Sequence, residues 1–413
     1  HVFGAGDHGT GEIDGLIAAL SARFVPPGPS ASPYRGRSDV RPTGRNLFTT
    51  DPRAVPSRAA YTQGVKLAEE LLRKHLQDHG DWPKGLVMDM WGSATIRTAG
   101  EEFAMALHLA GLSPRWDDGS DRVSGFDILP LALLNRPRID VTLRVSGLFR
   151  DMFPGLAQLF ETAIAKLAER PETAADNPYL VQTPRVFGPR PGSYGLGIGT
   201  AMDDYSDEAR TAAGEAWLAA SSYAIDARGE ITYARDALET QLTRADSFVH
   251  LQDLPETDLL MAEDYAAHEA GFAAAMQRLG EGGAAALSHL DATRPDQPRA
   301  RTLTEELARV VRARAANPDW ATGMMAHGFR GAAEIAATLD HLAAFAHLAG
   351  VVPDHLFDAM FDATLGRDDL VDFMQDANPQ ALAALRARFD ALHRAGLWTS
   401  RRNSVLAELG TPA

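Results

Sequence analysis

The chain has 413 residues, of which 45% are hydrophobic, and this length favours two or three domains over one. It contains no cysteine, which excludes disulfides, thiolate nucleophiles and Cys-type zinc sites and fits a reducing cytoplasm. Its formal net charge of -15 argues against a nucleic-acid-binding surface, and no apolar run is long enough to cross a bilayer.

Residues 1–56 form the first predicted segment, an extended, Pro-rich arm or linker. Proline fixes φ and removes a backbone donor, so neither a helix nor a central strand is expected there. The chain begins at His1 rather than at an initiator Met, which indicates a longer parent polypeptide. The prolines of the segment are Pro26, Pro27, Pro29, Pro33, Pro42, Pro52 and Pro56.

Residues 57–206 form the second predicted segment, an α/β domain. Alternation of apolar runs at strand and helix spacing is typical of a partly parallel sheet layered with helices. The predicted elements, in order, are a helix from Ser57 to Gly80, a buried strand at Leu86–Met88, a helix ending at Gly111, a half-exposed strand at Ile139–Val145 and a helix after Pro154. Residues 171–206 are rich in Pro, Gly and Asp and predict a long loop.

Residues 207–413 form the third predicted segment, which is mainly helical. Runs rich in Ala and Leu alternate there with short breakers, and no fixed repeat period is evident. The fold expected for the whole chain is therefore an α/β layer followed by a helical C-terminal region. Helical runs are predicted near 208–220, 233–244, 262–278, 302–316, 328–349 and 379–395, with breaks at Gly280–Gly283 and Asn317–Pro318.

The most polar stretch of the third segment runs from His250 to Glu269, directly after the strand-like pair Phe248–Val249. Side chains that follow the carboxyl end of a strand point into a crevice. His and carboxylate together suit borderline divalent metals and proton transfer, whereas the same acids also stabilise a helix N-terminus. The candidates for catalysis are His250, Asp253, Glu256, Asp264, His268 and Glu269, and those for metal ligation are His250, Asp253, Asp258 and His268.

Three residues at other strand exits are candidates for substrate binding. Trp91 and Arg97 lie on a strand-to-helix turn whose free amides suit an anion, although an ordinary turn is the favoured explanation of this stretch taken alone. Arg150 follows the next strand and is suited either to clamp a carboxylate bidentately or to pair with Asp151.

The chain contains no P-loop string, so it is not expected to hold ATP in such a loop. A series of strings in fixed order resembles the large subunits of cobaltochelatase (CobN type) and magnesium chelatase (H type). The Pro-rich arm and Pro-Thr-Gly-Arg-Asn look closer to the cobalt type. The strings are Arg23–Pro29, Arg41–Phe48, Asp51–Pro56, Trp91–Ala94, Arg144–Asp151, Arg185–Gly188, the acidic loop His250–Glu269, Asn317–Trp320 and Gly396–Trp398.

This resemblance implies part of the tetrapyrrole-binding subunit of an ATP-dependent cobaltochelatase, which inserts Co²⁺ into hydrogenobyrinic acid a,c-diamide in cobalamin biosynthesis. It also implies a separate AAA+ ATPase motor subunit with a metal-binding partner subunit, which hydrolyse ATP together with Mg²⁺. The family's His- and Glu-containing signature is absent and is expected before His1, so the chain alone is expected to be inactive. No nucleic acid or membrane is expected as a partner.

Two alternatives stay open at this point. A magnesium chelatase H-type subunit acting on protoporphyrin IX belongs to the same family. A non-catalytic helical module that docks an AAA+ motor would explain the helical region without chemistry. An independent hydrolase is disfavoured because the chain shows no recognisable nucleophile and base.

Overall fold

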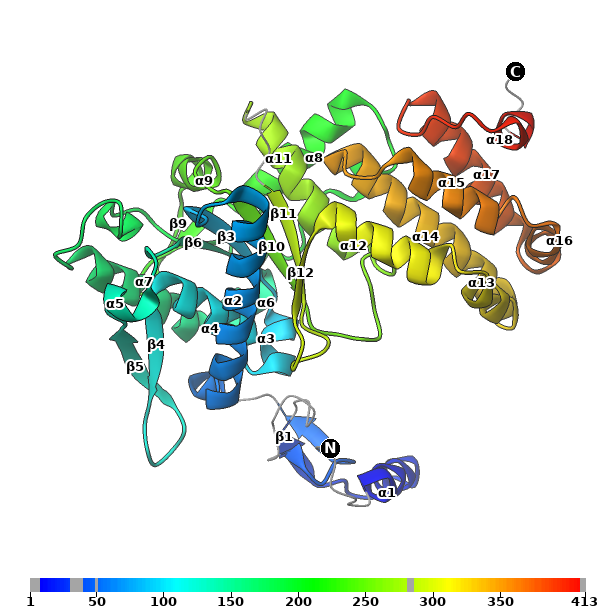
Figure 1. Cartoon of the computed structure of the whole chain (residues 1–413). Helices are drawn as coiled ribbons and strands as arrows, with labels where there is room; N and C mark the ends of the chain where they lie inside the picture. Colours follow the sequence, from blue (N-terminus) through cyan, green and yellow to red (C-terminus); the bar gives the residue numbers. More distant parts are fainter. Residues whose placement is uncertain (1–7, 30–39, 49–50, 281–285, 409–413) are drawn as a thin grey trace. The chain divides into compact units, whose positions relative to one another are not determined.

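The computed structural model describes residues 8–29, 40–48, 51–280 and 286–408. The chain divides into two compact units, each with its own strands and helices (Figure 1). Residues 30–39 of the predicted arm and 281–283 of the predicted break lie outside the described residues. The first unit comprises His1–Tyr194, Ser221–Ala245 and Ala292–Arg299, and the second comprises Gly195–Ala220, Asp246–Asp291 and Ala300–Ala413, so their boundaries differ from the expected 1–56, 57–206 and 207–413.

The first unit is built on a partly parallel run of strands in the order β3-β6-β7-β8-β9. β3, β6 and β7 are parallel, and β8 and β9 are antiparallel to their neighbours. Parallel strands need long crossover connections, which helices supply here. This arrangement confirms the predicted partly parallel sheet. The strands are β3 (Gly85–Met90), β6 (Asp140–Val145), β7 (Val186–Gly188), β8 (Tyr223–Ile225) and β9 (Ile231–Tyr233).

The strand β6 is buried along its whole length, so the prediction of a half-exposed strand is wrong. Its polar residues face protein partners instead of water. The Asp140 carboxylate pairs with Arg185, the Thr142 hydroxyl accepts a hydrogen bond from Gln241, and the Arg144 guanidinium pairs with an aspartate on β3. A central parallel strand is covered on both faces, and its polar side chains are therefore satisfied internally.

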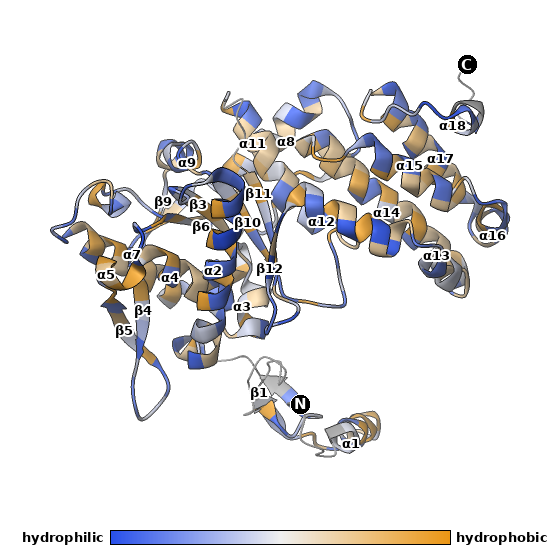
Figure 2. Ribbon diagram, in the orientation of Figure 1, coloured by the Kyte–Doolittle hydropathy of each residue, from blue (hydrophilic) through white to orange (hydrophobic). Residues whose placement is uncertain are grey.

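The helix α2 (Arg58–His79) begins and ends as the sequence predicts. Ser57 Oγ accepts a hydrogen bond from the Ala60 amide at 3.1 Å, and Gly80 follows the helix with a φ of 77°. α2 packs against α4 (Glu101–Ala110), whose hydrophobic colouring is visible in Figure 2. A Cβ at Gly64 would lie 2.6 Å from the Met105 amide nitrogen, so glycine permits this close approach.

The helix α1 (His8–Leu20) lies within the segment predicted as an extended arm, and that prediction is wrong for these residues. The prolines begin at Pro26, so they constrain only the chain beyond the helix. The remaining elements of the unit are β1 (Pro27–Pro29), β2 (Asn46–Phe48), α3 (Gly92–Thr98), β4 (Leu112–Trp116), β5 (Val123–Ile128), α5 (Leu131–Leu134), α6 (Gly147–Met152), α7 (Pro154–Ala168) and α9 (Arg235–Leu242).

The second unit places the strands β10, β11 and β12 beside a group of helices, of which α14 lies against α13, α16 and α17 (Figure 1). The helical C-terminal region is confirmed, whereas β11 and β12 were not predicted. No helix in the described ranges is long and apolar enough to span a bilayer. The strands are β10 (Ser247–Gln252), β11 (Ala286–Asp291) and β12 (Arg299–Thr302).

The helices of the second unit are interrupted twice by π-helical turns, at Ala266–Ala270 and at Val311–Ala315. Such turns are rare and are frequent at functional sites. The helices are α8 (Asp207–Ala219), α10 (Glu263–Tyr265), α11 (Gly271–Arg278), α12 (Leu303–Val310), α13 (Pro318–Met325), α14 (Gly328–Ala349), α15 (Asp354–Ala363), α16 (Asp368–Ala377), α17 (Pro379–Arg394) and α18 (Asn403–Glu408).

Candidate functional site

Two histidines lie side by side on the parallel strands β10 and β11 of the second unit. The strand register pairs His250 with His289, and both side chains are buried. Their rings stack with centroids 5.8 Å apart and an interplanar angle of 28°. The parallel register therefore joins residues 39 positions apart in sequence into one polar group inside the unit.

A side-chain oxygen lies near each ring nitrogen of His289. The Gln252 amide nitrogen donates to the backbone carbonyls of Leu254 and Thr257, at 3.2 and 2.5 Å, so its Oε1 faces His289. The His289 Nε2 lies 2.9 Å from this oxygen and must therefore donate to it. The Nδ1 lies 3.3 Å from Glu269 Oε1, a second acceptor. Both ring nitrogens therefore lie within hydrogen-bonding distance of a side-chain oxygen, an arrangement that suits the protonated form of the imidazole.

The carboxylate partner, Glu269, comes from the π-helical turn Ala266–Ala270. Its side chain is fully buried and pairs with His289. The second oxygen, Oε2, accepts no hydrogen bond from any residue in the described part of the chain. Buried carboxylate oxygens are normally satisfied, and an exception in a native structure is associated with strain or with chemistry.

Further charges surround the histidine pair. Glu306 is buried and is held by Arg301 at 3.0 Å and by Arg309 at 2.5 Å. Burial alone would lower the pKa of His289, but the charges of Glu269, Glu306 and Asp291 outweigh it and raise this pKa above 6.5. The direction agrees with the oxygen atoms that face both ring nitrogens of His289.

The structure separates the predicted catalytic residues into two groups. His250, Asp253, His268 and Glu269 are buried at or near the end of β10 and the π-helical turn. Glu256 and Asp264 are exposed. Glu256 lies on the loop after β10, and Asp264 lies on the first turn of α10.

The predicted metal ligands do not lie together in a group that could hold a cation. Across the described ranges, no group of three or more His, Asp or Glu side chains is placed to hold a metal ion. Asp258 is bound bidentately by Arg314, at 2.5 and 2.8 Å, so its carboxylate is engaged in an ion pair rather than directed to a cation. The His268 backbone carbonyl accepts a hydrogen bond from the Trp217 indole.

Sequence reasoning missed Gln252 as a site residue and did not connect His289 or Glu306 to the acidic stretch. No local motif marks these residues. The string Ala286–Asp291 does not alternate between apolar and polar residues, so it carries no clear strand signal. Assigning that strand as the parallel neighbour of β10 would have placed His289 beside His250.

The predicted substrate residues lie in the first unit. The Trp91 indole donates to Asp89 Oδ2 at 2.5 Å, and the same carboxylate binds the Arg144 guanidinium at 3.2 Å. Burial lowers the pKa of Arg144, opposed by the Asp89 charge. Trp91 and Arg97 are half-buried at the two ends of α3. Trp91 is therefore held in one orientation by a buried ion pair.

Arg150 is enclosed by its own unit. Its guanidinium binds Asp151 at 2.7 and 3.0 Å and donates to the carbonyls of Pro189, Arg190 and Ser193. These partners occupy the guanidinium N–H groups of Arg150 that were predicted to bind a substrate carboxylate. Of the two roles predicted for Arg150, the structure shows the pairing with Asp151. The hydrogen bonds to the three carbonyls also hold the loop that follows β7 in place.

Comparisons with known proteins agree on one family. A family model described as CobN/Magnesium Chelatase matches residues 5–405. The aerobic cobaltochelatase subunit CobN of Sinorhizobium sp is 44% identical, over 98% of this chain and 34% of its own length. The CobN subunit of Pseudomonas aeruginosa is 43% identical, over 94% of this chain and 33% of its own length.

A solved structure gives the same result. The catalytic subunit of cobaltochelatase from Mycobacterium tuberculosis superposes with a TM-score of 0.88 and 36% identity, covering 98% of this chain and 36% of its own. Magnesium-chelatase H subunits are more distant, at 25–29% identity. The chain spans about a third of the length of the curated relatives it matches.

Proposed function

Because this chain belongs to the CobN/magnesium chelatase family, we propose that it forms part of the tetrapyrrole-binding subunit of an ATP-dependent cobaltochelatase. The observation that carries the proposal is the markedly higher identity to CobN subunits than to magnesium-chelatase subunits. The substrate proposed is hydrogenobyrinic acid a,c-diamide, with Co²⁺ as the second substrate. The same observation disfavours magnesium insertion into protoporphyrin IX.

Metal insertion requires removal of water from the cation and of protons from the ring nitrogens. A positioned side chain that accepts a proton accelerates such a step. We assign proton acceptance to the buried residues His250 and Glu269, which both lie against His289, and to Asp253, which is buried directly after β10. His289 pairs with Glu269 and is assigned to holding this carboxyl group in place.

The other predicted roles divide in the same way. His250, Asp253 and His268 are kept as transient contacts for the cation, whereas Asp258 is not, because Arg314 occupies its carboxylate. Trp91 and Arg97 are assigned to orienting the macrocycle. Arg150 is left out of this set because five donor contacts hold it within the protein.

The proposed partners are an AAA+ motor subunit and its metal-binding partner subunit, which hydrolyse ATP with Mg²⁺ in the cytoplasm. The chain itself has no P-loop string, which fits a division of labour between subunits. We do not expect cobalt insertion by this chain alone.

An absorbance titration with hydrogenobyrinic acid a,c-diamide tests the proposal. The 413-residue chain is expected to shift the corrinoid spectrum with saturation and to leave the spectrum of protoporphyrin IX unchanged. Binding of protoporphyrin IX alone would favour the magnesium reaction. No spectral change with either ring would favour a docking module and contradict the proposed function.

A further inference from the structure

The helix α1 of the first unit carries a row of large apolar side chains that face solvent. Ile13, Leu16, Ile17 and Leu20 recur at the spacing of one helix face, and Phe24 follows on the next segment. Their exposed fractions are 60, 60, 48, 80 and 83%. We call these five residues the α1 apolar face. No other described part of the first unit covers it.

The orientation of this face is set by the other side of the helix. Gly11 and Gly15 lie against the backbone of Thr43 and Gly44, and a Cβ at Gly15 would overlap the Gly44 carbonyl oxygen. Gly44 itself has a φ of 79°, which favours glycine. Close glycine contact holds one side of the helix to the Gly44 turn and leaves the apolar face outward.

Contact of these apolar side chains with water is energetically unfavourable. Burial of Leu, Ile and Phe side chains stabilises a protein, and contiguous exposed apolar patches usually mark an interaction site. Anchors at i, i+3, i+4 and i+7 are the pattern by which an amphipathic helix enters an apolar groove. The α1 apolar face has this spacing from Ile13 to Leu20.

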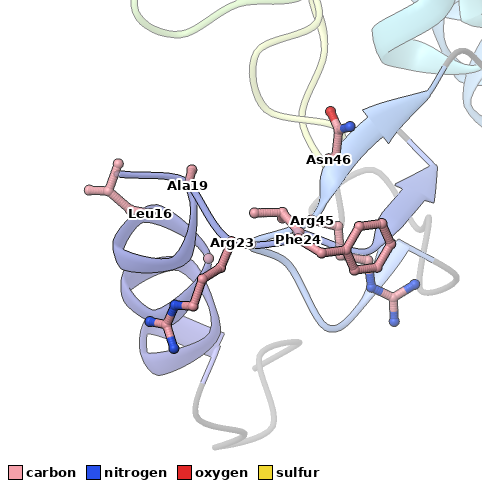
Figure 3. A pocket seen from close by; sticks show the side chains of 9 residues that line it. Leu16, Ala19, Arg23, Phe24, Arg45 and Asn46 are labelled. Carbon is pink, nitrogen blue, oxygen red and sulfur yellow. The ribbon is translucent and has the colours of Figure 1, made fainter. Parts of the chain in front are cut away.

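A hollow beside the face indicates the chemistry of the occupant. It has a volume of about 530 Å³ and is lined by apolar side chains together with two arginines (Figure 3). Leu16 projects from the helix and Phe24 lies on the segment after it (Figure 3). Arg23 and Arg45 are paired with no acid among the described residues. An apolar surface with an acidic side chain at its edge would complement this region.

We propose that the α1 apolar face is covered, in a full-length CobN-type subunit, by the portion of the polypeptide that this chain does not span. The relatives supply the necessary length, because the matched region covers 98% of this chain but only 34% of the Sinorhizobium subunit and 36% of the solved mycobacterial one. The face is thus an interface within one subunit, and its occupant is an apolar surface bearing a carboxylate near Arg23 and Arg45.

Thiol labelling tests this proposal directly, because the chain has no cysteine of its own. Leu20→Cys is made in the 413-residue chain and in a full-length chimera in which this chain replaces the matching third of the Sinorhizobium CobN subunit. Leu133→Cys replaces another exposed leucine, whose exposed fraction is 71%. It controls for a general decrease of the labelling rate in the chimera. The label is a small maleimide, and both proteins are also measured unfolded in urea.

The expected result is fast labelling of Leu20→Cys in the chain alone and at least tenfold slower labelling in the chimera. In the chimera, Leu16→Glu with Leu20→Glu should restore fast labelling at Ile13→Cys, whereas Asp14→Lys should not. Equal rates in chain and chimera would overturn the proposal. Slow labelling of the dilute 413-residue chain would show that its own residues cover the face. A labelling rate that falls only at high protein concentration would show that a second copy of the chain covers it. Either result overturns the proposal.

Discussion

At the scale of single residues, the buried pair of Glu269 and His289 is the feature most sensitive to change. Removing one partner of a buried ion pair leaves an uncompensated charge and costs about 3–5 kcal/mol, whereas removing both costs less. We predict that His289→Leu lowers the free energy of unfolding by this amount and that His289→Leu with Glu269→Leu lowers it less. Urea unfolding measures both.

The control for this cycle is His79→Leu, at an exposed position at the end of α2, which should change stability by no more than about 0.5 kcal/mol. The single variant Glu269→Leu completes the cycle, and a double variant whose loss of stability equals the sum of the losses in His289→Leu and Glu269→Leu would show that the two residues do not act as a pair.

Glu161 of α7 provides a pH-dependent prediction in the first unit. Burial, with a contribution from Asp226, raises the pKa of Glu161 from 4.5 to about 7, against two backbone N–H donors. The folded state holds this proton more tightly than the unfolded state, so stability is present at low pH and is lost as pH rises from 4.5 through 7. The full change corresponds to on the order of 3 kcal/mol.

Glu161→Gln keeps a side-chain oxygen that accepts hydrogen bonds from the backbone amides of Arg185 and Val186, and it removes the titratable group. We therefore expect the variant to match the parent protein near pH 5 and to be the more stable of the two at pH 8, as measured by urea unfolding. Unfolding free energies that run parallel across this pH range would contradict the account of this carboxyl group.

The catalytic candidates show what local sequence can and cannot supply. His250, Asp253 and Glu269 lie within one acidic stretch, so their grouping was visible from the sequence. His289 joins them only through the register of β10 and β11, and Glu306 only through arginines from β12 and α12. Pairing between strands is a tertiary property, and no spacing along the chain encodes it.

At the scale of elements, the close packing of α2 on α4 gives a further prediction. Gly64→Ala would place a methyl group against Met105 N and Ala104 Cβ, at 2.6 and 2.7 Å, and both belong to a buried helix. Overpacking of this kind costs about 1–3 kcal/mol. We expect Gly64→Ala to lower the midpoint of thermal unfolding.

The matched control is Gly323→Ala on α13, where a Cβ would meet no atom within 4 Å. There the substitution should stabilise the protein by about 0.5–1 kcal/mol, because glycine is a poor helix residue. A destabilising Gly323→Ala or a neutral Gly64→Ala would contradict this packing analysis.

Helices with caps were predictable, whereas short strands were not. Ser57, Gly80 and Gly111 mark helix ends in the sequence and in the structure. β7, β8 and β9 have three residues each, too few to show an alternation. The alternation in β6 was real, but Asp140, Thr142 and Arg144 are satisfied by buried partners, which a pattern of polarity cannot distinguish from solvent.

At the scale of the whole molecule, family membership was predictable because it rests on many short strings in a fixed order rather than on one motif. The comparisons confirm it over nearly the whole chain. The division into two units was not predictable, because residues 221–245 belong with the first unit and 195–220 with the second. The chain spans about a third of the length of the CobN subunits that it matches.

The most direct test of the central claim is cobalt insertion by the full-length chimera, reconstituted with its motor subunits and hydrogenobyrinic acid a,c-diamide. Loss of a positioned proton acceptor typically lowers a rate by about 10²–10⁴-fold. We predict such a loss for His250→Ala with unchanged folding, and full activity for His327→Ala, at an exposed histidine. Equal insertion rates in His250→Ala and the parent chimera would contradict the claim that the buried site on β10 takes part in the reaction.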